Sequence, residues 1–224
     1  DFFTRKLKPG ARRFGNSKNI ISSPIDGCVS QIGDITQNRL IQAKNHDYTL
    51  LKLTAGYEDF YHPFVNGKFC TLYLSPKDYH CVHIPTDAKL IKSLYIPGKF
   101  FSVNEVSNEC IPGIYTKNTR LLCLFETAFG PMCVIFVGAM IVGQIVTKWG
   151  GAMHYTDHPI LKDHSKEKLE FKKGEEIGHF ELGSTIILLF NKDIHWNPDD
   201  LHSGSPIQLG QEIGKITHKI NKTN

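Results

Sequence analysis

The sequence predicts a β-rich α+β fold, in which one domain is built on antiparallel sheets with a folded-over, barrel-sandwich-like β core and few helices. Short runs rich in β-branched and aromatic residues alternate with clusters of Gly, Pro, Asn and Asp. Several runs are apolar at every position, as in strands that are covered on both faces. An internal repeat, KGEEIGHF at 173–180 and LGQEIGKI at 209–216, carries paired glycines that suit tight turns of a folded-over sheet.

Individual elements follow from these runs and from the residues that bound them. A helix is expected near Tyr57–Asn66 or Lys99–Asn104, and the polar segment Tyr155–Lys173 is expected to be a surface loop. The expected strands are Leu50–Leu53, Thr71–Leu74, Leu121–Phe125, Met132–Val137, Ala139–Val142 and Thr185–Phe190.

Length and composition are those of an ordinary globular protein. The chain has 224 residues, of which 41% are hydrophobic and 21% charged, and we expect a single catalytic domain over residues 1–224. A net charge of +4 is too small to indicate a nucleic-acid partner. A basic cluster near the start could meet membrane phosphates, although a solvated basic tail explains it equally well: Arg5, Lys6, Lys8, Arg12 and Arg13.

Targeting and redox signals are sparse. No signal peptide is visible and residue 1 is Asp, so we expect an upstream segment to be missing. The longest apolar stretch, Pro131–Gly143, is too short to span a bilayer. The cysteines form no CxxC pair, which favours reduced thiols, a cytosol-facing location and no closed zinc site: Cys28, Cys70, Cys81, Cys110, Cys123 and Cys133.

Three segments carry candidate chemistry. SSPIDGCVSQIG places Asp26 in a turn before a strand, and HFELGSTIILLF places Ser184 directly after a glycine at the start of an apolar strand. YLSPKDYHCVHIP contains His80 and His83. The flanking prolines favour a strand there, on which positions i and i+3 point to opposite faces, so the two histidines should have different roles and no shared metal.

Each segment also has a plainer interpretation. Asp-Gly is a common turn, two histidines can simply be surface residues, and a serine often begins a strand. Ser184 does not lie in a Gly-x-Ser-x-Gly elbow. Asp26, His83 and Ser184 together resemble an acid–base–nucleophile set, but with 11 histidines in the chain such sets arise by chance. These residues alone leave the function undecided.

A more extensive pattern resembles one known family, the phosphatidylserine decarboxylases, and in particular their bacterial form. The Leu-Gly-Ser-Thr stretch at 182–185 is similar to the family's self-cleavage motif, while residues 155–172 and the tail after Asn191 show no clear match. The resemblance covers most of residues 1–190 in order, through DFFTRKLKPGARR, PIDGCVSQIG, IQAKNHDYTLLKLTAG, YLSPKDYHCVHIP, YIPGKFFSVNE, LCLFETAFGPMCVIFVGAMIVG and KGEEIGHFELGSTIILLF.

The resemblance implies a proenzyme that converts phosphatidylserine to phosphatidylethanolamine and CO2. Ser184 would become a covalent pyruvoyl cofactor after cleavage of the Gly183–Ser184 bond, with neither metal nor pyridoxal phosphate. Residues 1–183 and 184–224 would remain as a non-covalent pair of β and α chains. Asp26 and His83 would complete the cleavage triad with Ser184, and His80 would assist decarboxylation.

The resemblance also implies a homodimer at the cytoplasmic face of a bacterial inner membrane, held there as a peripheral protein. Phe60, Phe64, Phe100 and Phe101 are the residues we expect at an apolar rim that contacts the lipid. Three alternatives stay open. They are a Ser-His-Asp hydrolase, a non-catalytic phospholipid-binding β domain, and a pyruvoyl decarboxylase for a soluble amino acid.

Overall fold

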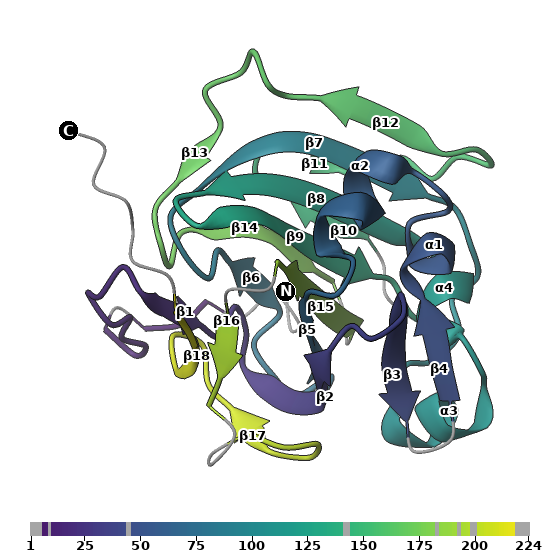
Figure 1. Ribbon diagram of the computed structural model, residues 1–224, viewed down its shortest axis with the longest axis horizontal. Helices are drawn as coiled ribbons and strands as arrows, with labels where there is room; N and C mark the ends of the chain where they lie inside the picture. Colours follow the sequence, from purple (N-terminus) through teal and green to yellow (C-terminus); the bar gives the residue numbers. More distant parts are fainter. Residues whose placement is uncertain are drawn as a thin grey trace.

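Antiparallel sheets dominate the computed structural model, and the helices are short and peripheral (Figure 1). Every pairing between the described strands is antiparallel. The structure describes residues 6–217, apart from 9, 44–45, 141–143, 182–183, 192–193 and 198–200.

The largest sheet has nine strands in the order β12-β7-β8-β9-β15-β5-β2-β17, with β13 also paired to β7. Its central strand β15 is buried at every position, as the continuous apolar run predicts. The strand bounds are β2 Gly27–Asp34, β5 Lys68–Leu74, β7 Ala88–Ile96, β8 Arg120–Thr127, β9 Gly130–Val137, β12 Ile160–Asp163, β13 Glu170–Phe171, β15 Ser184–Phe190 and β17 Pro206–Ile207.

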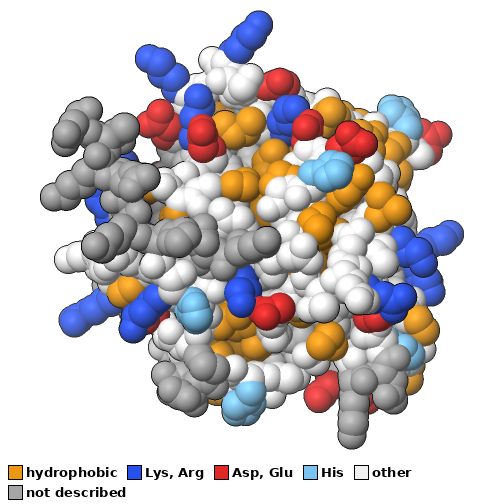
Figure 2. Space-filling model, in the orientation of Figure 1, with side chains coloured by type: hydrophobic (Ala, Val, Ile, Leu, Met, Phe, Trp, Pro, Cys, Tyr) orange, Lys and Arg blue, Asp and Glu red, His pale blue; other side chains and the backbone are white. Residues whose placement is uncertain are grey.

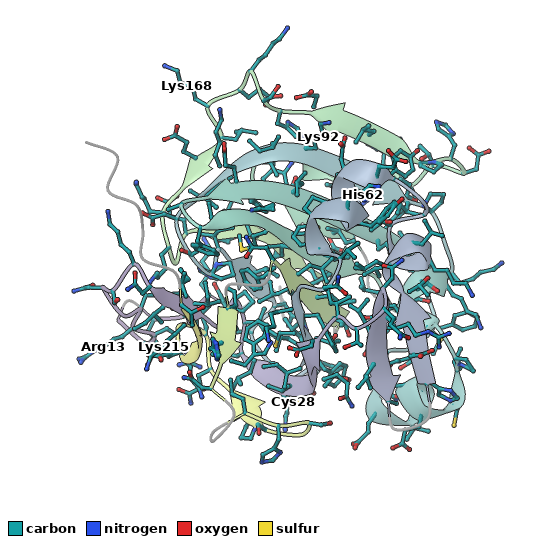
Figure 3. All side chains as sticks on the ribbon, in the orientation of Figure 1. Arg13, Cys28, His62, Lys92, Lys168 and Lys215 are labelled. Atoms are coloured by element: carbon teal, nitrogen blue, oxygen red, sulfur yellow. The ribbon has the colours of Figure 1, made fainter. Side chains whose placement is uncertain are left out.

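A four-stranded sheet, β11-β10-β14-β6, packs against the large sheet. The rings of Phe136 in β9 and Phe180 in β14 lie 5.4 Å apart between the two layers. Side chains fill this interior (Figure 3). The remaining strands form a three-stranded sheet, β1-β18-β16, and a hairpin, β3-β4. The bounds are β1 Ile20–Ser22, β3 Arg39–Ala43, β4 His46–Thr49, β6 Cys81–His83, β10 Ile145–Thr147, β11 Gly151–Ala152, β14 Glu176–Phe180, β16 Ile194–Trp196 and β18 Glu212–Ile216.

The described helices are each six residues or shorter. Isolated helices of this length are unstable in water, so packing on the sheets must hold them. Their bounds are α1 Leu50–Leu53, α2 Glu58–Tyr61, the 3₁₀ helix η1 His62–Phe64, α3 Glu105–Cys110 and α4 Ile114–Lys117.

The internal repeat forms two equivalent turns. Gly174 and Gly210 both have a φ of +85°, the left-handed region that favours glycine, and strands β14 and β18 follow them. A second pair of segments matches these turns, SPIDG with Asp26 and IPTDA with Asp87. Oδ1 of Asp26 accepts a hydrogen bond from the backbone N of Leu209 at 2.7 Å. Oδ1 of Asp87 accepts one from the backbone N of Lys173 at 2.9 Å. The turns that precede β14 and β18 are therefore equivalent, each with a left-handed glycine and an aspartate that accepts from its backbone.

The prediction of a β-rich fold of antiparallel sheets with few helices is confirmed, and the described strands do not close into a barrel. Three of the expected strands fall within β5, β8 and β9, and a fourth within β15. The helix expected near residues 57–66 is present as α2 followed by η1.

Some local predictions are wrong. Leu50–Leu53 is helix α1, not a strand, because Oγ1 of Thr49 caps it by accepting from the backbone N of Lys52, and only the i and i+3 leucines are buried. No helix covers Lys99–Asn104, since Asn104 instead caps the N-terminus of α3. The expected loop at 155–173 contains β12 and β13, which extend the sheet along β7.

The strand expected at Ala139–Val142 is also not found where the chain is described. Ala139 and Met140 follow the end of β9 outside any strand, and residues 141–142 lie outside the described residues. The apolar stretch that contains them is mostly β9. In the part of the chain that the structure describes, no helix is long and apolar enough to cross a bilayer. Positive and negative side chains are intermixed on the face in Figure 2.

Candidate functional site

The candidate residues gather where the chain passes twice between the two largest sheets. The chain leaves β5 of the nine-stranded sheet and enters β6 of the four-stranded sheet through residues 75–80. It returns from β14 to β15 through residues 181–183. Because β6 pairs with β14 and β5 pairs with β15, the strand ends that flank the two crossings meet at one corner. His80 ends the first crossing and Ser184 ends the second.

Ser184 is the first residue of β15, opposite Leu74 at the end of β5, and its side chain is fully buried. Alternation along the strand places it on the same face as Ile186, whose neighbour Phe136 meets Phe180 of the four-stranded sheet. Ser184 therefore faces the layer between the two sheets. Its Oγ has no hydrogen-bond partner among the described residues. A buried hydroxyl without a partner is unfavourable by about 1–3 kcal/mol, so it calls for an explanation.

His80 lies beside this layer. It is buried, and its carbonyl oxygen accepts a hydrogen bond from the backbone N of Phe180 at 3.1 Å, which ties it to the strand that leads toward Ser184. Alternation through β6 puts His80 on the same side as the buried Val82 and opposite to His83. The two histidines therefore lie in different environments, His80 buried and His83 at a cleft.

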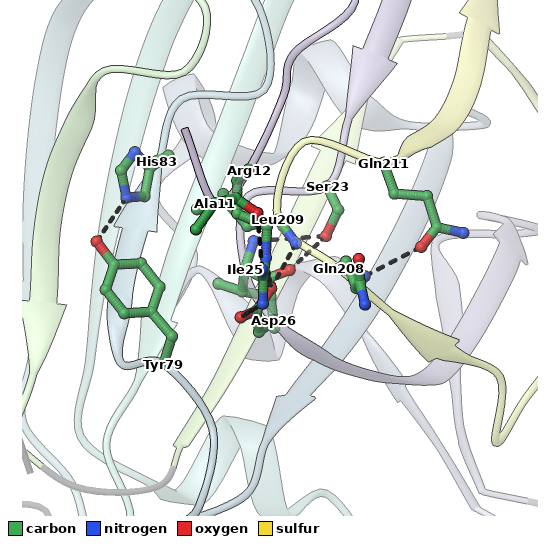
Figure 4. Close-up of polar contacts among 10 residues, drawn as sticks. All are labelled: Ala11, Arg12, Ser23, Ile25, Asp26, Tyr79, His83, Gln208, Leu209 and Gln211. Atoms are coloured by element: carbon green, nitrogen blue, oxygen red, sulfur yellow. Dashed lines mark hydrogen bonds and ion pairs between the residues drawn. The ribbon is translucent and has the colours of Figure 1, made fainter. Parts of the chain in front are cut away.

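His83 lines a cleft of about 740 Å³ on the outer side of β6. Its Nδ1 donates to the carbonyl oxygen of Gly174 at 2.7 Å, which fixes the tautomer, so Nε2 accepts from the hydroxyl of Tyr79 at 3.0 Å (Figure 4). Burial lowers the pKa of His83, and the nearby carboxylates of Glu176 and Asp26 oppose this shift. The imidazole is therefore held neutral, with a basic nitrogen presented to a hydroxyl.

Asp26 binds Arg12 rather than His83. Its two carboxylate oxygens accept from Nε and Nη2 of Arg12 at 2.8 and 2.5 Å, in addition to the bond from Leu209 (Figure 4). This paired geometry raises the pKa of Arg12. A backbone bond from N of His83 to the carbonyl oxygen of Pro24, at 2.9 Å, holds the Asp26 turn against β6.

The structure thus brings the predicted residues to one corner without joining them into a hydrogen-bonded triad. Asp26 and His83 are neighbours across the Pro24 bond, and Ser184 and His80 share the buried layer. None of the hydrogen bonds between described residues joins Asp26, His83 and Ser184 to one another. Gly183, the other half of the expected cleavage bond, lies outside the described residues.

Two contacts of the site were missed by the sequence analysis, those of Tyr79 with His83 and of Arg12 with Asp26. Tyr79 lies within the YLSPKDYHCVHIP segment, and Arg12 belongs to the basic cluster near the start. The similarity of SPIDG and IPTDA indicates that Asp26 and Asp87 form equivalent turns, but no sequence signal identified Arg12 as the partner of Asp26. No group of three or more His, Cys, Asp or Glu suited to a metal ion occurs among the described residues.

The four aromatic residues expected at a lipid rim separate into two pairs. Phe60 and Phe64 lie fully buried in the core, which leaves no surface for contact with a lipid in this conformation. Phe100 and Phe101 are each 38% exposed. The fully buried Asn118 holds their loop, since its Oδ1 accepts from the backbone N of Phe101 and its Nδ2 donates to the carbonyl oxygen of Phe101.

Comparisons with known proteins agree with one another. The family model described as phosphatidylserine decarboxylase matches residues 1–215. The chain is 46% identical over 218 residues to the phosphatidylserine decarboxylase proenzyme of Coxiella burnetii (strain RSA 331 / Henzerling II), covering 96% of this chain and 77% of that protein. It is 42% identical over 221 residues to that of Marinobacter nauticus, with 97% and 77% covered. For Aliivibrio salmonicida the identity is 43% over 224 residues, with 96% and 77% covered.

Proposed function

The chain belongs to the phosphatidylserine decarboxylase family, whose enzymes are carboxy-lyases, and from this premise we propose that it matures by cutting its own Gly183–Ser184 bond. In this proposal Ser184 becomes a covalent pyruvoyl group, with which the enzyme converts phosphatidylserine to phosphatidylethanolamine and CO2. The observation that carries the proposal is the buried Oγ of Ser184, which lacks a hydrogen-bond partner among the described residues and begins the central strand of the core.

The residues around Ser184 fit such a group. A pyruvoyl group has no hydroxyl, so the layer that leaves Oγ of Ser184 without a partner would lose no hydrogen bond when the side chain is converted. Burial beneath the four-stranded sheet would keep water from a reactive carbonyl. Once formed, the group supplies an electron sink for the electrons that the departing carboxylate leaves behind.

Self-cleavage requires a base, because a serine hydroxyl is a weak nucleophile. Oγ of Ser184 attacks the carbonyl carbon of Gly183, and the amide nitrogen leaves as an amine, which gives an ester. Removal of the α-proton of residue 184 then expels the Gly183 carboxylate and leaves a dehydroalanine. That residue tautomerises to an imine, and water hydrolyses the imine with release of ammonia. The first step and the elimination each need a proton acceptor.

His83 is suited to be that acceptor, since burial keeps it neutral and its Nε2 is already the accepting nitrogen. Tyr79 now occupies this nitrogen, so we propose that the Tyr79 hydroxyl relays the proton from Ser184 to His83 or moves aside during cleavage. Asp26 would stabilise the charged imidazolium through space, because its carboxylate already raises the pKa of His83 in this arrangement.

Changing His83 to Ala or Asp26 to Asn is expected to leave one intact chain on a denaturing gel. Loss of a general base slows such a step by about 10²–10⁴-fold, which is enough to prevent maturation during expression.

In the unmodified protein, the rate of cleavage should be constant near neutral pH and fall in acid. Because burial lowers the pKa of His83, this fall should be centred below about 6.5, the ordinary histidine value.

Asp87→Asn provides the matched control for Asp26→Asn. Asp87 makes the same bond to the backbone of the neighbouring turn, so Asp87→Asn reproduces the disturbance of the turn without loss of the Arg12 pair that only Asp26 makes. Cleavage should survive in Asp87→Asn and fail in Asp26→Asn. Equal cleavage of the two variants would mean that Asp26 has only a structural role.

His80→Ala is expected to cleave normally and to lose lipid turnover. His80 lies on the buried side of β6 with Ser184, away from the cleft that His83 lines, and we propose that it delivers the proton that replaces CO2 at the α-carbon. Processing is measured by intact mass, and turnover by release of CO2 from vesicles that contain phosphatidylserine. A processed His80→Ala protein with ordinary turnover would contradict this role.

Phe100 and Phe101 are proposed to contact the bilayer that holds the substrate. Both rings are exposed on a loop that Asn118 fixes through the backbone N and the carbonyl oxygen of Phe101. Because the loop is already ordered, binding of these apolar rings to a membrane would cost little further conformational entropy of the backbone. The double change to serine should reduce co-sedimentation with vesicles several-fold while cleavage continues. Unchanged sedimentation would remove these residues from the proposed interface.

A serine hydrolase that uses Asp26, His83 and Ser184 is the rival function, and intact mass distinguishes the two. A hydrolase stays as one chain. The proposed decarboxylase gives two chains, and the smaller begins at a blocked residue 184 that gains the mass of a phenylhydrazine adduct. A single unmodified chain with esterase activity at Ser184 would overturn the proposal.

A further inference from the structure

A second constellation of catalytic residue types lies at the opposite edge of the large sheet, in a segment that gave no family resemblance. The hydroxyl of Ser93, in β7, donates to Nε2 of His164 over 2.9 Å. Nδ1 of the same ring donates to Oε1 of Glu167 over 3.0 Å. Ser93 and His164 are both 5% exposed, and Glu167 is half exposed. Each ring nitrogen therefore has the partner that a serine nucleophile and an orienting carboxylate would provide.

These side chains line a cavity of about 340 Å³, within the size range of small-ligand sites. One wall is the face of β7 and β12, where Ser93 stands opposite Lys162 and Tyr95 opposite Ile160. The other wall is the hairpin of β10 and β11 with the turn that carries Trp149, whose ring meets the imidazole of His164 edge-on at 6.5 Å.

The hydrogen bonds among Ser93, His164 and Glu167 are not needed to hold β12 and the residues after it on the sheet. β12 is already paired with β7 along Ile160–Asp163, and the backbone N of His164 continues the pairing by donating to the carbonyl oxygen of Ile91 at 2.8 Å. Both nitrogens of the buried His164 ring are engaged, in the order that makes Nε2 a base toward a hydroxyl.

We propose that Ser93, His164 and Glu167 form a second active site that transfers or hydrolyses short acyl esters, independently of the decarboxylase. Oγ of Ser93 attacks the ester carbonyl carbon while its proton passes to Nε2 of His164. The tetrahedral intermediate collapses, the carbon–oxygen bond to the alcohol breaks, and the alcohol leaves with that proton. Water then attacks the acyl-serine with His164 again as base, which releases the acid and restores Ser93.

The surroundings define the substrate class. Lys162, directly across from Ser93 and part of the cavity wall, carries the positive charge that can stabilise the oxyanion of the intermediate. Tyr95, Trp149 and Met153 give the rest of the cavity an apolar lining that suits a hydrocarbon acyl group. A cavity of about 340 Å³ admits a short chain and not a diacyl lipid.

The test is covalent labelling of the full-length protein with a fluorophosphonate probe, mapped by peptide mass spectrometry, together with hydrolysis of p-nitrophenyl butyrate. We expect the adduct on Ser93. Ser93→Ala should lose both the adduct and the hydrolysis, while its release of CO2 from phosphatidylserine vesicles stays unchanged. Glu167→Gln, which keeps the side-chain shape, should label more slowly, and His164→Ala should label at least about 100-fold more slowly.

Ser165→Ala is the matched control, because this serine lies beside His164 in the same segment and should not affect labelling. Melting temperatures identify any variant that fails to fold, and Glu167→Gln then decides the question in place of His164→Ala. Absence of a Ser93 adduct in the folded protein overturns the proposal. So does a labelling rate that neither His164→Ala nor Glu167→Gln changes, since the serine would then react without its base. An adduct confined to Ser184 has the same consequence.

Discussion

Ser184→Ala is expected to remain a single uncleaved chain with no carbonyl that reacts with phenylhydrazine and no measurable release of CO2. Without Oγ there is no nucleophile to open the Gly183–Ser184 bond, and no ester can form whose elimination would give the dehydroalanine that precedes the pyruvoyl group. The loss should be complete, not the about 10²–10⁴-fold reduction expected for removing a general base. Intact mass and a vesicle decarboxylation assay measure both outcomes.

The same substitution should leave the protein as stable as before, or raise its free energy of unfolding by up to about 1 kcal/mol. Oγ of Ser184 is buried without a partner among the described residues, so alanine removes an unsatisfied polar atom and little else. A protein that gains stability when it loses function would show that the hydroxyl is retained for chemistry. Denaturant unfolding of the uncleaved variant measures this effect. His83→Ala is an uncleaved reference that, in addition, lacks the bonds of His83 to Tyr79 and Gly174.

Ser22→Ala is the matched control. Ser22 is likewise fully buried, and its Oγ also lacks a partner among the described residues. Cleavage and turnover should be ordinary in this variant, with a similar small effect on stability. Cleavage of Ser184→Ala would show that the bond is broken by some route other than attack by Ser184. Failure of Ser22→Ala to cleave would show that loss of cleavage does not single out Ser184 as the nucleophile.

The sequence predicted an element correctly where a continuous run of residues carried the pattern, and it failed where a single contact or a distant strand decided the structure. β15 was evident because seven consecutive positions are buried, and that burial leaves only apolar or β-branched residues after Ser184. Leu50–Leu53 was misread because four apolar-rich residues fit a strand or a helix equally well. The feature that decides between them is a single hydrogen bond, from the backbone N of Lys52 to Oγ1 of Thr49, and the apolar pattern does not reveal it. β12 was missed because three of its four residues are exposed and polar edge strands have no apolar period.

The candidate site was predictable as a set of residues but not as an arrangement. The local segments singled out Asp26, His80, His83 and Ser184 as candidates, the resemblance assigned their roles, and alternation predicted that the two histidines face apart. The bond between Asp26 and Arg12 depends on where a segment 14 residues away folds back, which no local pattern records. The same holds for His164, which meets Ser93 across 71 residues only because β12 returns to β7.

Arg120→Met is expected to give the largest loss of stability of any single change considered, about 3–5 kcal/mol. Arg120 begins β8, is 2% exposed and has no carboxylate partner among the described residues. Its guanidinium instead donates to four backbone carbonyl oxygens at the ends of α1 and α4. They belong to Leu53 at 2.6 Å, Thr116 and Asn118 at 2.9 Å, and Lys52 at 3.0 Å.

These four acceptors include carbonyl groups that the ends of such short helices leave without intrahelical partners. Burial lowers the pKa of Arg120 to about 10, which still leaves the side chain charged at neutral pH and able to use all its donors. Methionine keeps the length of the side chain but none of these donors, so the carbonyl oxygens would lose this partner. Of the four, only that of Lys52 keeps a backbone donor, at Ala55, among the hydrogen bonds between described residues. For a protein of this size the melting temperature should fall by about 6–20 °C.

Arg39→Met separates this effect from the loss of any arginine. Arg39 is 60% exposed and pairs with Asp47 at 2.8 Å on the surface of the β3-β4 hairpin, where such a pair contributes less than about 1 kcal/mol. Arg120→Lys should lie between the two, because one ammonium can reach some of the four carbonyls but not all. Equal melting temperatures for Arg39→Met and Arg120→Met would mean that the carbonyl oxygens of α1 and α4 find water or other donors. In that case the buried guanidinium does not hold the helices to the sheet. A large fall for Arg120→Met alone would show that these one-turn helices depend on a single side chain of the strand beneath them.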